Sequence, residues 1–277
     1  MITGASSGIG RATALALDRA GWRVFAGVRT RKAAADLGRE ASSRLTPVIL
    51  DVTQPARVAA TAAEIRASLG REAGLDALVS NAGIMAAVGP LEFTATDAVR
   101  RQLEVNLIGH LVVIKAFLPA LRKRRGRIVV VGSLSGRMPL PLMGGYMAAE
   151  HALEAVCDVL RVELRPWRVP VSLIEASLIR TPIWAKGEKA TLASRRMRPA
   201  AVGGVYARMM DRGWSAMRRV YGRWNAPPER VAAVVLRIME ARRPKARYGA
   251  GVFSGTVPYY RLVPARLVDA VLGRFLS

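Results

Sequence analysis

The residue pattern with the clearest chemistry is the glycine-rich stretch Thr3-Gly4-Ala5-Ser6-Ser7-Gly8-Ile9-Gly10, which opens directly into an amphipathic segment. Such a turn brings backbone N–H groups close to phosphate oxygens, because glycine has no side chain to block the approach and a helix begins with unpaired N–H groups. A Walker A loop is excluded, since no Gly-Lys-Ser/Thr closes the stretch. An ordinary tight turn would have a similar composition, so the prediction of a phosphate site depends on the elements around it.

The elements that must position this turn follow a strict alternation of short apolar runs and longer amphipathic stretches. The alternation predicts βαβ units, and therefore an α/β fold with a parallel sheet and helices on both faces. The predicted strands are Val24–Val28, Thr46–Leu50, Ala77–Ser80, Ile128–Val131 and Val171–Ile174. The predicted helices are Ile9–Ala20, Val58–Leu69, Thr96–Leu121 and Tyr146–Leu164.

The organisation of the chain indicates a single domain over residues 1–277, because no internal repeat or low-complexity linker divides it. We divide this domain into a core at 1–181, an inserted lobe at 182–227, and a C-terminal helix, strand and basic amphipathic tail at 228–277. Only two residues precede the glycine-rich stretch, so we expect the central first strand to be truncated.

Further polar motifs follow the glycine-rich turn in a fixed order, at the ends of predicted strands and within predicted helices. They are Asp51-Val52, Asn81-Ala82-Gly83, Asn106, Ser133 and Tyr146. In order and spacing, residues 1–184 resemble the short-chain dehydrogenase/reductase (SDR) family. The resemblance implies a Rossmann-type doubly wound parallel sheet with a small substrate lobe, and an oxidoreductase that binds NAD(H) or NADP(H).

The cofactor residues implied by the resemblance surround the pyrophosphate, the adenosine and the nicotinamide. They are Gly4, Ser6, Ser7, Gly8, Ile9, Gly10, Asp51, Val52, Asn81, Ala82, Gly83, Tyr146, Ile179 and Thr181. One departure lies near the nicotinamide end, where the family usually has Pro-Gly and this chain has Ala176-Ser177.

The choice between the two dinucleotides is a question of charge. A carboxylate after the second strand of the fold favours NAD, whereas the 2′-phosphate of NADP needs a cation there. The chain reads Gly27-Val28-Arg29-Thr30-Arg31-Lys32 at that point, with no acid before Asp36. We predict that Arg29 clamps the 2′-phosphate, with Arg11 as a second candidate, so NADP(H) is preferred and NAD(H) is the second choice. The alternative is that these cations are only solvated loop residues.

The catalytic residues implied by the resemblance are Asn106, Ser133 and Tyr146, together with a lysine four residues after the tyrosine, where this chain has Glu150. In the family the tyrosine is the general acid or base, the serine holds the substrate oxygen, and the lysine binds the nicotinamide ribose and lowers the tyrosine pKa. A carboxylate disfavours a phenolate, so Glu150 should weaken activity, and more for alcohol oxidation than for ketone reduction. The alternative is a catalytically impaired SDR-fold protein that binds a dinucleotide as a pseudoenzyme or regulator.

Substrate recognition falls to the region after residue 181, which is rich in Trp, Met and Arg and which in the family forms the substrate loop and lid. Such residues suit a bulky apolar ketone or secondary alcohol, such as a steroid, a retinoid or a fatty-chain compound, although they would also suit ordinary core packing. The tail at 263–276 has an apolar helical face with arginines nearby. It would close the pocket, pack against a partner subunit, or rest on an anionic membrane surface.

The net charge of +23 comes from 43 basic and 20 acidic residues, and residues 180–277 hold 20 of the basic but only 5 of the acidic ones. Such an excess attracts anions in general, including phosphorylated cofactors, lipid headgroups and nucleic acid. With 37 Arg against 6 Lys, the excess also fits the compositional bias of a GC-rich genome. The basic run at 122–127 falls in a helix-to-strand turn, so we regard nucleic-acid binding as the weaker interpretation.

Other classes of protein are disfavoured by single residues and by patterns that the chain lacks. Cys157 is the only cysteine, so a disulfide scaffold is excluded. No run approaches about 18 uninterrupted apolar residues and no cleavable leader is evident, so we expect a cytoplasmic protein, and we predict no metal site. His151 is a weak candidate to replace the missing lysine, and we expect His110 to be a packed or interface residue. The resemblance implies a homodimer or homotetramer formed through the helices predicted at 96–121 and 146–164.

Overall fold

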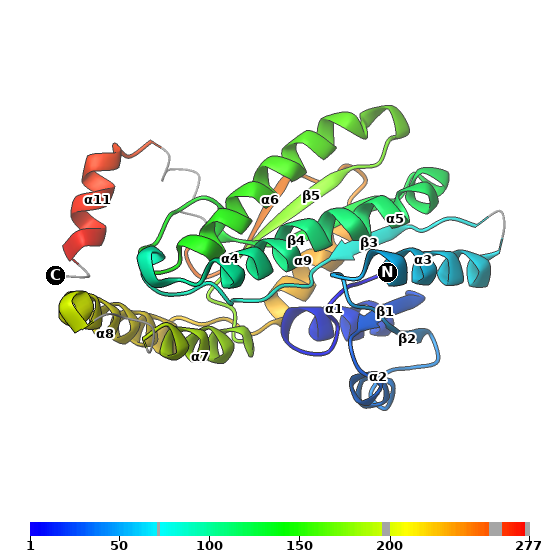
Figure 1. Cartoon of the computed structure of the whole chain (residues 1–277). Helices are drawn as coiled ribbons and strands as arrows, with labels where there is room; N and C mark the ends of the chain where they lie inside the picture. The colour runs from blue at the N-terminus through cyan, green and yellow to red at the C-terminus, as the bar shows by residue number, and fades with distance from the viewer. Residues whose placement is uncertain (71–72, 196–199, 255–261, 275–277) are drawn as a thin grey trace.

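The computed structural model describes residues 1–70, 73–195, 200–254 and 262–274, with the side chains of 192–195 and 200–203 left out of the description (Figure 1). A layer of strands lies between two layers of helices. A lobe made of α7 (Ile183–Arg195) and α8 (Ala200–Arg223) extends from one end, and the C-terminal α11 (Ala265–Arg274) stands beside it.

The strands form one parallel sheet. They are β1 (Val24–Val28), β2 (Leu45–Ile49), β3 (Ala77–Ser80), β4 (Arg127–Ser133), β5 (Val171–Ser177) and β6 (Arg247–Gly251). β1 pairs with β2, while β3, β4, β5 and β6 pair in that order. Ile2 joins the two groups, because it bridges Ala26 of β1 and Val79 of β3. Residues 1–4 therefore contribute one bridging residue between β1 and β3 rather than a full-length strand.

The helices cover both faces of this sheet. Besides α7, α8 and α11 they are α1 (Gly8–Arg19), α2 (Arg31–Gly38), α3 (Pro55–Leu69), α4 (Thr96–Leu103), α5 (Gly109–Arg124), α6 (Gly144–Glu163) and α9 (Glu229–Glu240). Helices α1 and α9 pack together over one face, and α3, α5 and α6 cover the other. A π-helical turn, Glu104–Ile108, joins α4 to α5, and short 3-10 turns occur at Leu91–Phe93, Leu134–Gly136 and Arg165–Trp167.

Each face of the sheet has its own hydrophobic core, because successive strand residues point to opposite sides. In β4, Val129 and Val131 join the core beneath α1 and α9. Ile128 and Val130 of the same strand join the core beneath α3, α5 and α6. Burial on both faces explains why the strands read as continuous apolar runs in the sequence.

The predicted fold class is confirmed as an α/β fold with a parallel sheet and helices on both faces. Each of the five predicted strands begins within one residue of its expected start, although β4 and β5 continue to Ser133 and Ser177. The helix expected at 96–121 contains the π turn, and the short helix α2 was not predicted. Helix α2 begins at a Thr30 cap, whose hydroxyl accepts from the Ala33 N–H at 3.2 Å.

One helical stretch, Thr96–Arg124, is long and apolar enough to cross a membrane by length and composition, with a mean hydropathy of 1.5 in its most apolar window. We did not predict this stretch from the sequence, because it contains no run of about 18 uninterrupted apolar residues. In the fold, however, the α5 part of the stretch packs against α3 and β3, and its π turn carries the buried Asn106. Burial inside the fold, which covers 44% of that window, accounts for part of its apolar character.

Candidate active site

A groove of about 640 Å³ lies at the carboxyl ends of β1, β2 and β3, where the glycine-rich turn leads into α1. Ligands of doubly wound sheets bind at this edge, where the strand order reverses. All residues predicted for the pyrophosphate and adenosine border this groove, and Thr181 borders it as well. They are Gly4, Ser6, Ser7, Gly8, Ile9, Gly10, Arg29, Asp51, Val52, Asn81, Ala82 and Gly83.

The glycine-rich turn has no room for larger residues. Gly4 adopts a φ of +68°, and a Cβ atom there would lie 2.9 Å from the Cα atom of Ala82. A Cβ atom at Gly10 would overlap the carbonyl oxygen of Gly4. Ser7, the residue before α1, makes no capping hydrogen bond through its side chain, so the positive end of the helix dipole faces the groove. The turn therefore fits a dinucleotide pyrophosphate.

Thr3 ties the phosphate turn to the loop after β3. Its fully buried hydroxyl accepts the N–H groups of Asn81 at 2.9 Å and Ala82 at 3.0 Å. The Asn81 side-chain amide in turn donates to the Thr3 carbonyl at 2.9 Å. Asn81 thus stabilises the loop geometry, which agrees with its predicted supporting function.

The adenosine end of the groove contains Arg29 and Asp51. Asp51 Oδ1 accepts from the N–H and the hydroxyl of Thr53, at 3.0 and 2.8 Å. Partial burial raises the pKa of Asp51, but these hydrogen bonds and the nearby Arg29 and Arg101 outweigh it and leave the pKa below its ordinary value. Arg29 is exposed and borders the groove. Arg11 does not border it and pairs with Glu40 instead, so the structure does not support Arg11 as a second phosphate ligand.

A second cavity of about 450 Å³ opens from the nicotinamide end of the groove and shares Ile9, Asn81, Ala82, Gly83, Thr181 and Ile183 with it. Most of its lining is apolar, with methionines contributed by several elements. The large apolar residues include Met85, Met138, Leu140, Met143, Ile179, Trp184, Met217, Val220, Phe253 and Leu272. Ile179 and Tyr146, both predicted to contact the cofactor, lie here.

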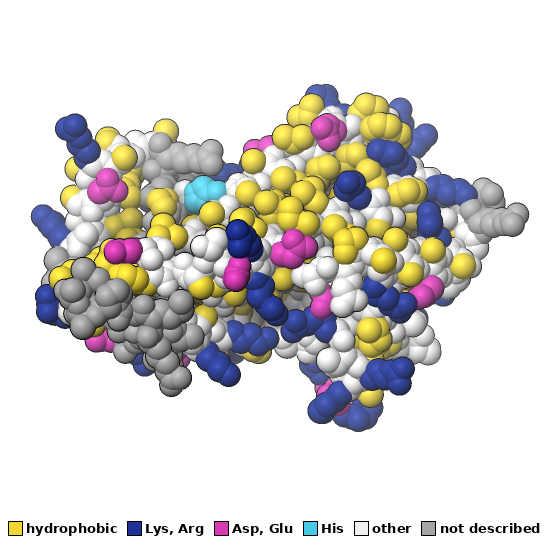
Figure 2. All heavy atoms as spheres, viewed as in Figure 1, with side chains coloured by type: hydrophobic (Ala, Val, Ile, Leu, Met, Phe, Trp, Pro, Cys, Tyr) yellow, Lys and Arg dark blue, Asp and Glu magenta, His cyan; other side chains and the backbone are white. Residues whose placement is uncertain are grey.

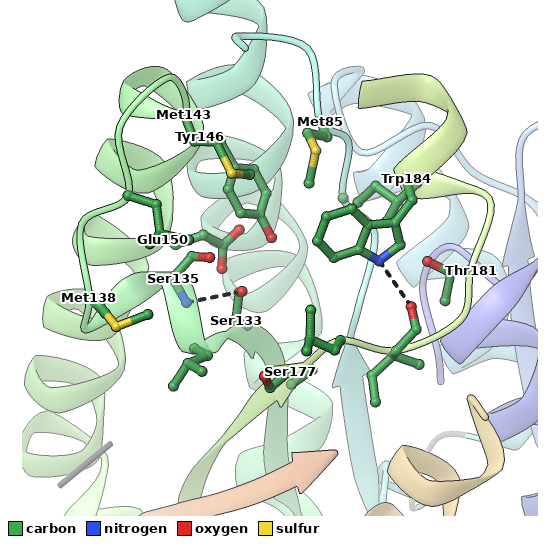
Figure 3. A pocket seen from close by; sticks show the side chains of 18 of the residues that line it. Met85, Ser133, Ser135, Met138, Met143, Tyr146, Glu150, Ser177, Thr181 and Trp184 are labelled. Carbon is green, nitrogen blue, oxygen red and sulfur yellow. Dashed lines mark hydrogen bonds between the residues drawn. The ribbon is translucent and has the colours of Figure 1, made fainter. Parts of the chain in front are cut away.

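The four predicted catalytic residues all border this apolar cavity. Ser133 ends β4, and its hydroxyl accepts from the Ser135 N–H at 3.1 Å. Tyr146 and Glu150 lie one turn apart on α6, and the Glu150 carboxyl points toward the Tyr146 hydroxyl and Ser133 (Figure 3). Glu150 Oε1 accepts from the Asn106 side-chain amide at 3.0 Å, and Asn106 is held by both polar groups of the Ile84 backbone.

The electrostatics of this site follow from burial. Burial raises the pKa of Glu150 to about 7; hydrogen bonds from Asn106 and from the Ser133 backbone lower it, and Glu154 raises it further. Burial also raises the pKa of the Tyr146 phenol, the Glu150 carboxylate raises it again, and the Ser133 side chain lowers it. The site therefore holds Tyr146 in its neutral, proton-donating form.

The two histidines do not supply a replacement cation. His151 makes a hydrogen bond from its ring to the Met147 carbonyl at 2.9 Å and does not border the cavity. His110 does border the cavity, but its Nδ1 lies 2.8 Å from the Ser80 hydroxyl, and burial lowers its pKa to about 4. His110 is therefore a neutral, packed residue.

A buried ionic cluster lies behind α6, and no motif in the sequence indicated it. Glu154, one turn after Glu150, accepts from Arg247 Nη2 at 2.8 Å, and Arg137 donates to Glu175 at 2.8 Å. Arg137 Nε also lies 3.7 Å from Glu154 Oε1. The cluster joins the loop after Ser133 to α6, β5 and β6, and so fixes the backbone that carries the residues predicted to be catalytic.

Sequence reasoning also missed several residues that the fold brings to the two cavities. Met85 follows the Asn81–Gly83 loop, and Met138 and Met143 lie between Ser133 and Tyr146. The cations Arg100, Arg101 and Lys186 border the groove. The only available signal was their closeness in sequence to recognised motifs, which does not show the direction of a side chain.

These features are typical of dinucleotide-dependent oxidoreductases. A glycine-rich turn that fits a pyrophosphate lies at the same edge of a parallel sheet as a cluster of Ser, Tyr and Asn side chains. A family model described as short chain dehydrogenase matches residues 1–191. The chain belongs to the short-chain dehydrogenase family and is an oxidoreductase.

Known relatives match nearly the whole chain. It is 37% identical over 277 residues to retinol dehydrogenase 5 of Mus musculus, covering 98% of this chain and 86% of that protein. It is 34% identical over 281 residues to 17-beta-hydroxysteroid dehydrogenase type 6 of Bos taurus, covering 99% and 87%. A solved short-chain dehydrogenase from Burkholderia cenocepacia in complex with NADP is similar in fold, with a TM-score of 0.73, 25% identity and coverage of 98% and 95%.

Proposed function

We propose that this protein is an NADP(H)-dependent oxidoreductase that transfers hydride between nicotinamide and a bulky apolar carbonyl compound or alcohol: a ketone or secondary alcohol of steroid or lipid-like type, or a retinoid aldehyde or alcohol. The observation that carries the proposal is that the dinucleotide groove and the apolar cavity meet close to the polar side chains of Ser133 and Tyr146. The dinucleotide groove opens into an apolar cavity, and Ser133 and Tyr146 border that cavity.

The substrate class is supported by the cavity and by the relatives. A volume of about 450 Å³ falls within the range of about 300–1,000 Å³ that small-molecule sites occupy. Methionine and tryptophan side chains adapt to large, rigid or polyene skeletons. Relatives named for retinol and for 17-beta-hydroxysteroids match nearly the full chain, which favours these two skeletons.

In the proposed reaction the nicotinamide, when bound, gives or takes the hydride. The Ser133 hydroxyl orients the substrate oxygen by a hydrogen bond, and the Tyr146 phenol donates a proton to that oxygen during reduction. Asn106 holds the Glu150 carboxyl in place through its 3.0 Å hydrogen bond. The apolar lining excludes water from the reacting atoms.

The preference for NADP(H) is supported by the exposed Arg29, whose guanidinium can bind a phosphate in two-pronged geometry. No acid lies between Arg29 and Asp36, and Asp36 pairs with Lys32 and Arg39. A structural relative binds NADP.

The direction of reaction is set by Glu150. Reduction uses neutral Tyr146 as the acid, whereas alcohol oxidation needs a phenolate, and the buried Glu150 disfavours that phenolate. We therefore expect ketone or aldehyde reduction to be the faster direction.

The test is single-turnover NADPH oxidation with a 17-ketosteroid, with retinaldehyde and with a small polar ketone. We expect turnover with one or both bulky substrates and none with the small polar ketone. NADPH binding without turnover of any of the three would contradict the proposed activity.

The second candidate function is a dinucleotide-binding protein without turnover, and Glu150 is the observation that favours it. Such a protein would still bind the cofactor, because neither the groove residues nor the hydrogen bonds of the Thr3 hydroxyl depend on position 150. A thermal shift with NADPH, combined with absent turnover in the same preparation, would identify this case.

Self-association is supported by apolar side chains that gather over α5 and α6 (Figure 2). Ile108, Val159 and Val162 are exposed there, the last at 65%. We propose a homodimer or homotetramer through these helices, which multi-angle light scattering would measure. A peripheral contact with an anionic membrane through α11 is a weaker proposal, based on its exposed Leu267 and Val271.

Nucleic-acid binding by the basic run at 122–127 is disfavoured, since three of its cations have partners within the protein. Arg122 lies over the Trp167 ring at 4.0 Å, and Arg124 pairs with Asp76 at 2.8 Å. Arg127 donates to the Ala241 carbonyl at the end of α9, at 3.0 Å. On the visible face, Lys and Arg side chains are spread around the molecule rather than gathered on this turn (Figure 2).

A further inference from the structure

The groove and the apolar cavity meet at the start of α7, where Thr181 and Ile183 border both. Lys186 lies one turn into this helix, and its N–H donates to the Pro182 carbonyl at 3.3 Å. Its exposed side chain borders the groove and not the apolar cavity. Within the part of the chain that the structure describes, Lys186 forms no ion pair.

The opposite wall at this point is the phosphate turn. A Cβ atom at Gly8 would lie 3.0 Å from Thr181 Cγ2 and 3.7 Å from Pro182 Cδ. The first turn of α1 and the start of α7 are therefore in direct contact. Any pyrophosphate on the α1 N-terminus lies within the reach of a lysine side chain one helical turn beyond Pro182.

We propose that Lys186 is a ligand of the cofactor pyrophosphate and that it thereby fixes α7 against the bound cofactor. This inference rests on the proposed function, because it requires a dinucleotide in the groove. The pyrophosphate is anionic, and the N-terminus of α1 supplies only a partial positive charge. A lysine ammonium on the facing wall adds a full positive charge.

The lysine usage of the chain supports this assignment. All six lysines lie in the described part of the chain, and Lys186 is the one that borders either cavity. At position 150, beside Tyr146, the site has a buried carboxyl and not a cation. Lys186 therefore supplies a positive charge on the lobe side of the groove near the nicotinamide end.

Helix α7 links this contact to the substrate cavity. Ile183 and Trp184 of the same helix line that cavity, and the Trp184 indole N–H donates to the Ile179 carbonyl at 3.1 Å (Figure 3). A side chain at Gly187 would overlap Met85, so the helix packs tightly on another cavity residue. Fixing α7 through Lys186 therefore fixes one wall of the substrate cavity, and we expect cofactor to raise substrate affinity.

The experiment measures dissociation constants for NADPH, NADH and adenosine 2′-monophosphate by fluorescence or calorimetric titration. Lys186→Ala is compared with Lys189→Ala, a matched control on the same helix whose exposed side chain borders neither cavity. We expect Lys186→Ala to raise the dissociation constants of NADPH and NADH by the same factor, about tenfold. Adenosine 2′-monophosphate, which has no pyrophosphate, should bind unchanged, and Lys186→Arg should recover most of the loss.

Equal dinucleotide affinities for Lys186→Ala and Lys189→Ala would overturn the inference while leaving the proposed function intact. A loss confined to NADPH would also overturn it, since that pattern places the lysine at the 2′-phosphate. Wild-type protein that binds neither dinucleotide would defeat the proposed function itself. Melting temperatures of all variants without ligand show whether each is folded.

Discussion

The predicted adenosine end and the predicted catalytic end of the site differ in how their charged groups are placed. At the predicted adenosine end, Arg29 is exposed and borders the groove. At the catalytic end, Glu150 is 5% exposed, and burial raises its pKa to about 7. An exposed charge can select a ligand at little cost in desolvation, whereas a buried charge changes the acid–base chemistry of its neighbours.

The largest expected effect comes from the catalytic end, with Tyr146→Phe. Removing the phenol proton should lower the rate of ketone reduction by about 10³-fold. The NADPH dissociation constant should stay within about twofold, because the groove residues keep their contacts. Stopped-flow kinetics and a binding titration measure the two quantities. If more than about a tenth of the rate survived, Tyr146 would not be the proton donor.

Glu150→Lys should produce the next largest change. An ammonium beside Tyr146 lowers the phenol pKa, so alcohol oxidation should rise by about 10²-fold and reduction by much less. The matched variant Glu150→Gln removes the charge without adding a cation. Its rate of alcohol oxidation should lie between those of the wild type and Glu150→Lys. Initial rates in both directions at one pH test this prediction. Equal gains in both directions would show that Glu150 does not act through the phenol.

Arg29→Ala probes the predicted adenosine end. It should raise the dissociation constant of NADPH by about tenfold and leave that of NADH unchanged. The reason is that only NADPH has the 2′-phosphate, so only NADPH loses the charge-assisted hydrogen bonds from the Arg29 guanidinium. Calorimetric titration of both dinucleotides measures the ratio, and Arg31→Ala, a nearby exposed cation, serves as the control. An unchanged NADPH to NADH ratio would remove Arg29 from the specificity site.

The last effect concerns stability rather than activity or binding. The pKa of Glu150 is raised in the folded state from 4.5 to about 7, so the folded protein binds more protons than the unfolded chain between those values. Stability contributed by the neutral carboxyl is therefore present below pH 4.5 and is lost as pH rises through about 7, by on the order of 3 kcal/mol. Glu150→Gln should melt a few degrees above wild type at pH 8 and close to wild type at pH 5. A difference independent of pH would contradict the raised pKa.

The fold and much of the cofactor groove could be predicted from the sequence, because backbone geometry decides them. Glycines at 4 and 10, strands buried on both faces and polar residues at strand ends all have local signatures. The rest depended on contacts between distant segments. Arg11 was the second candidate after Arg29, and its pairing with Glu40 has no signal in the sequence; the Arg137–Glu175 pair likewise joins residues 38 positions apart. The methionines of the cavity lie in loops whose side-chain directions are set by packing rather than by periodicity.

The Thr3 hydroxyl, which accepts two N–H groups from the loop after β3, has a consequence for substitutions elsewhere in the site. It fastens the phosphate turn to that loop without using any of the residues predicted to be catalytic. Replacing Glu150 removes none of these hydrogen bonds, so we expect the groove to keep its shape when position 150 is varied. Turnover and cofactor binding can then be measured separately in one series of variants.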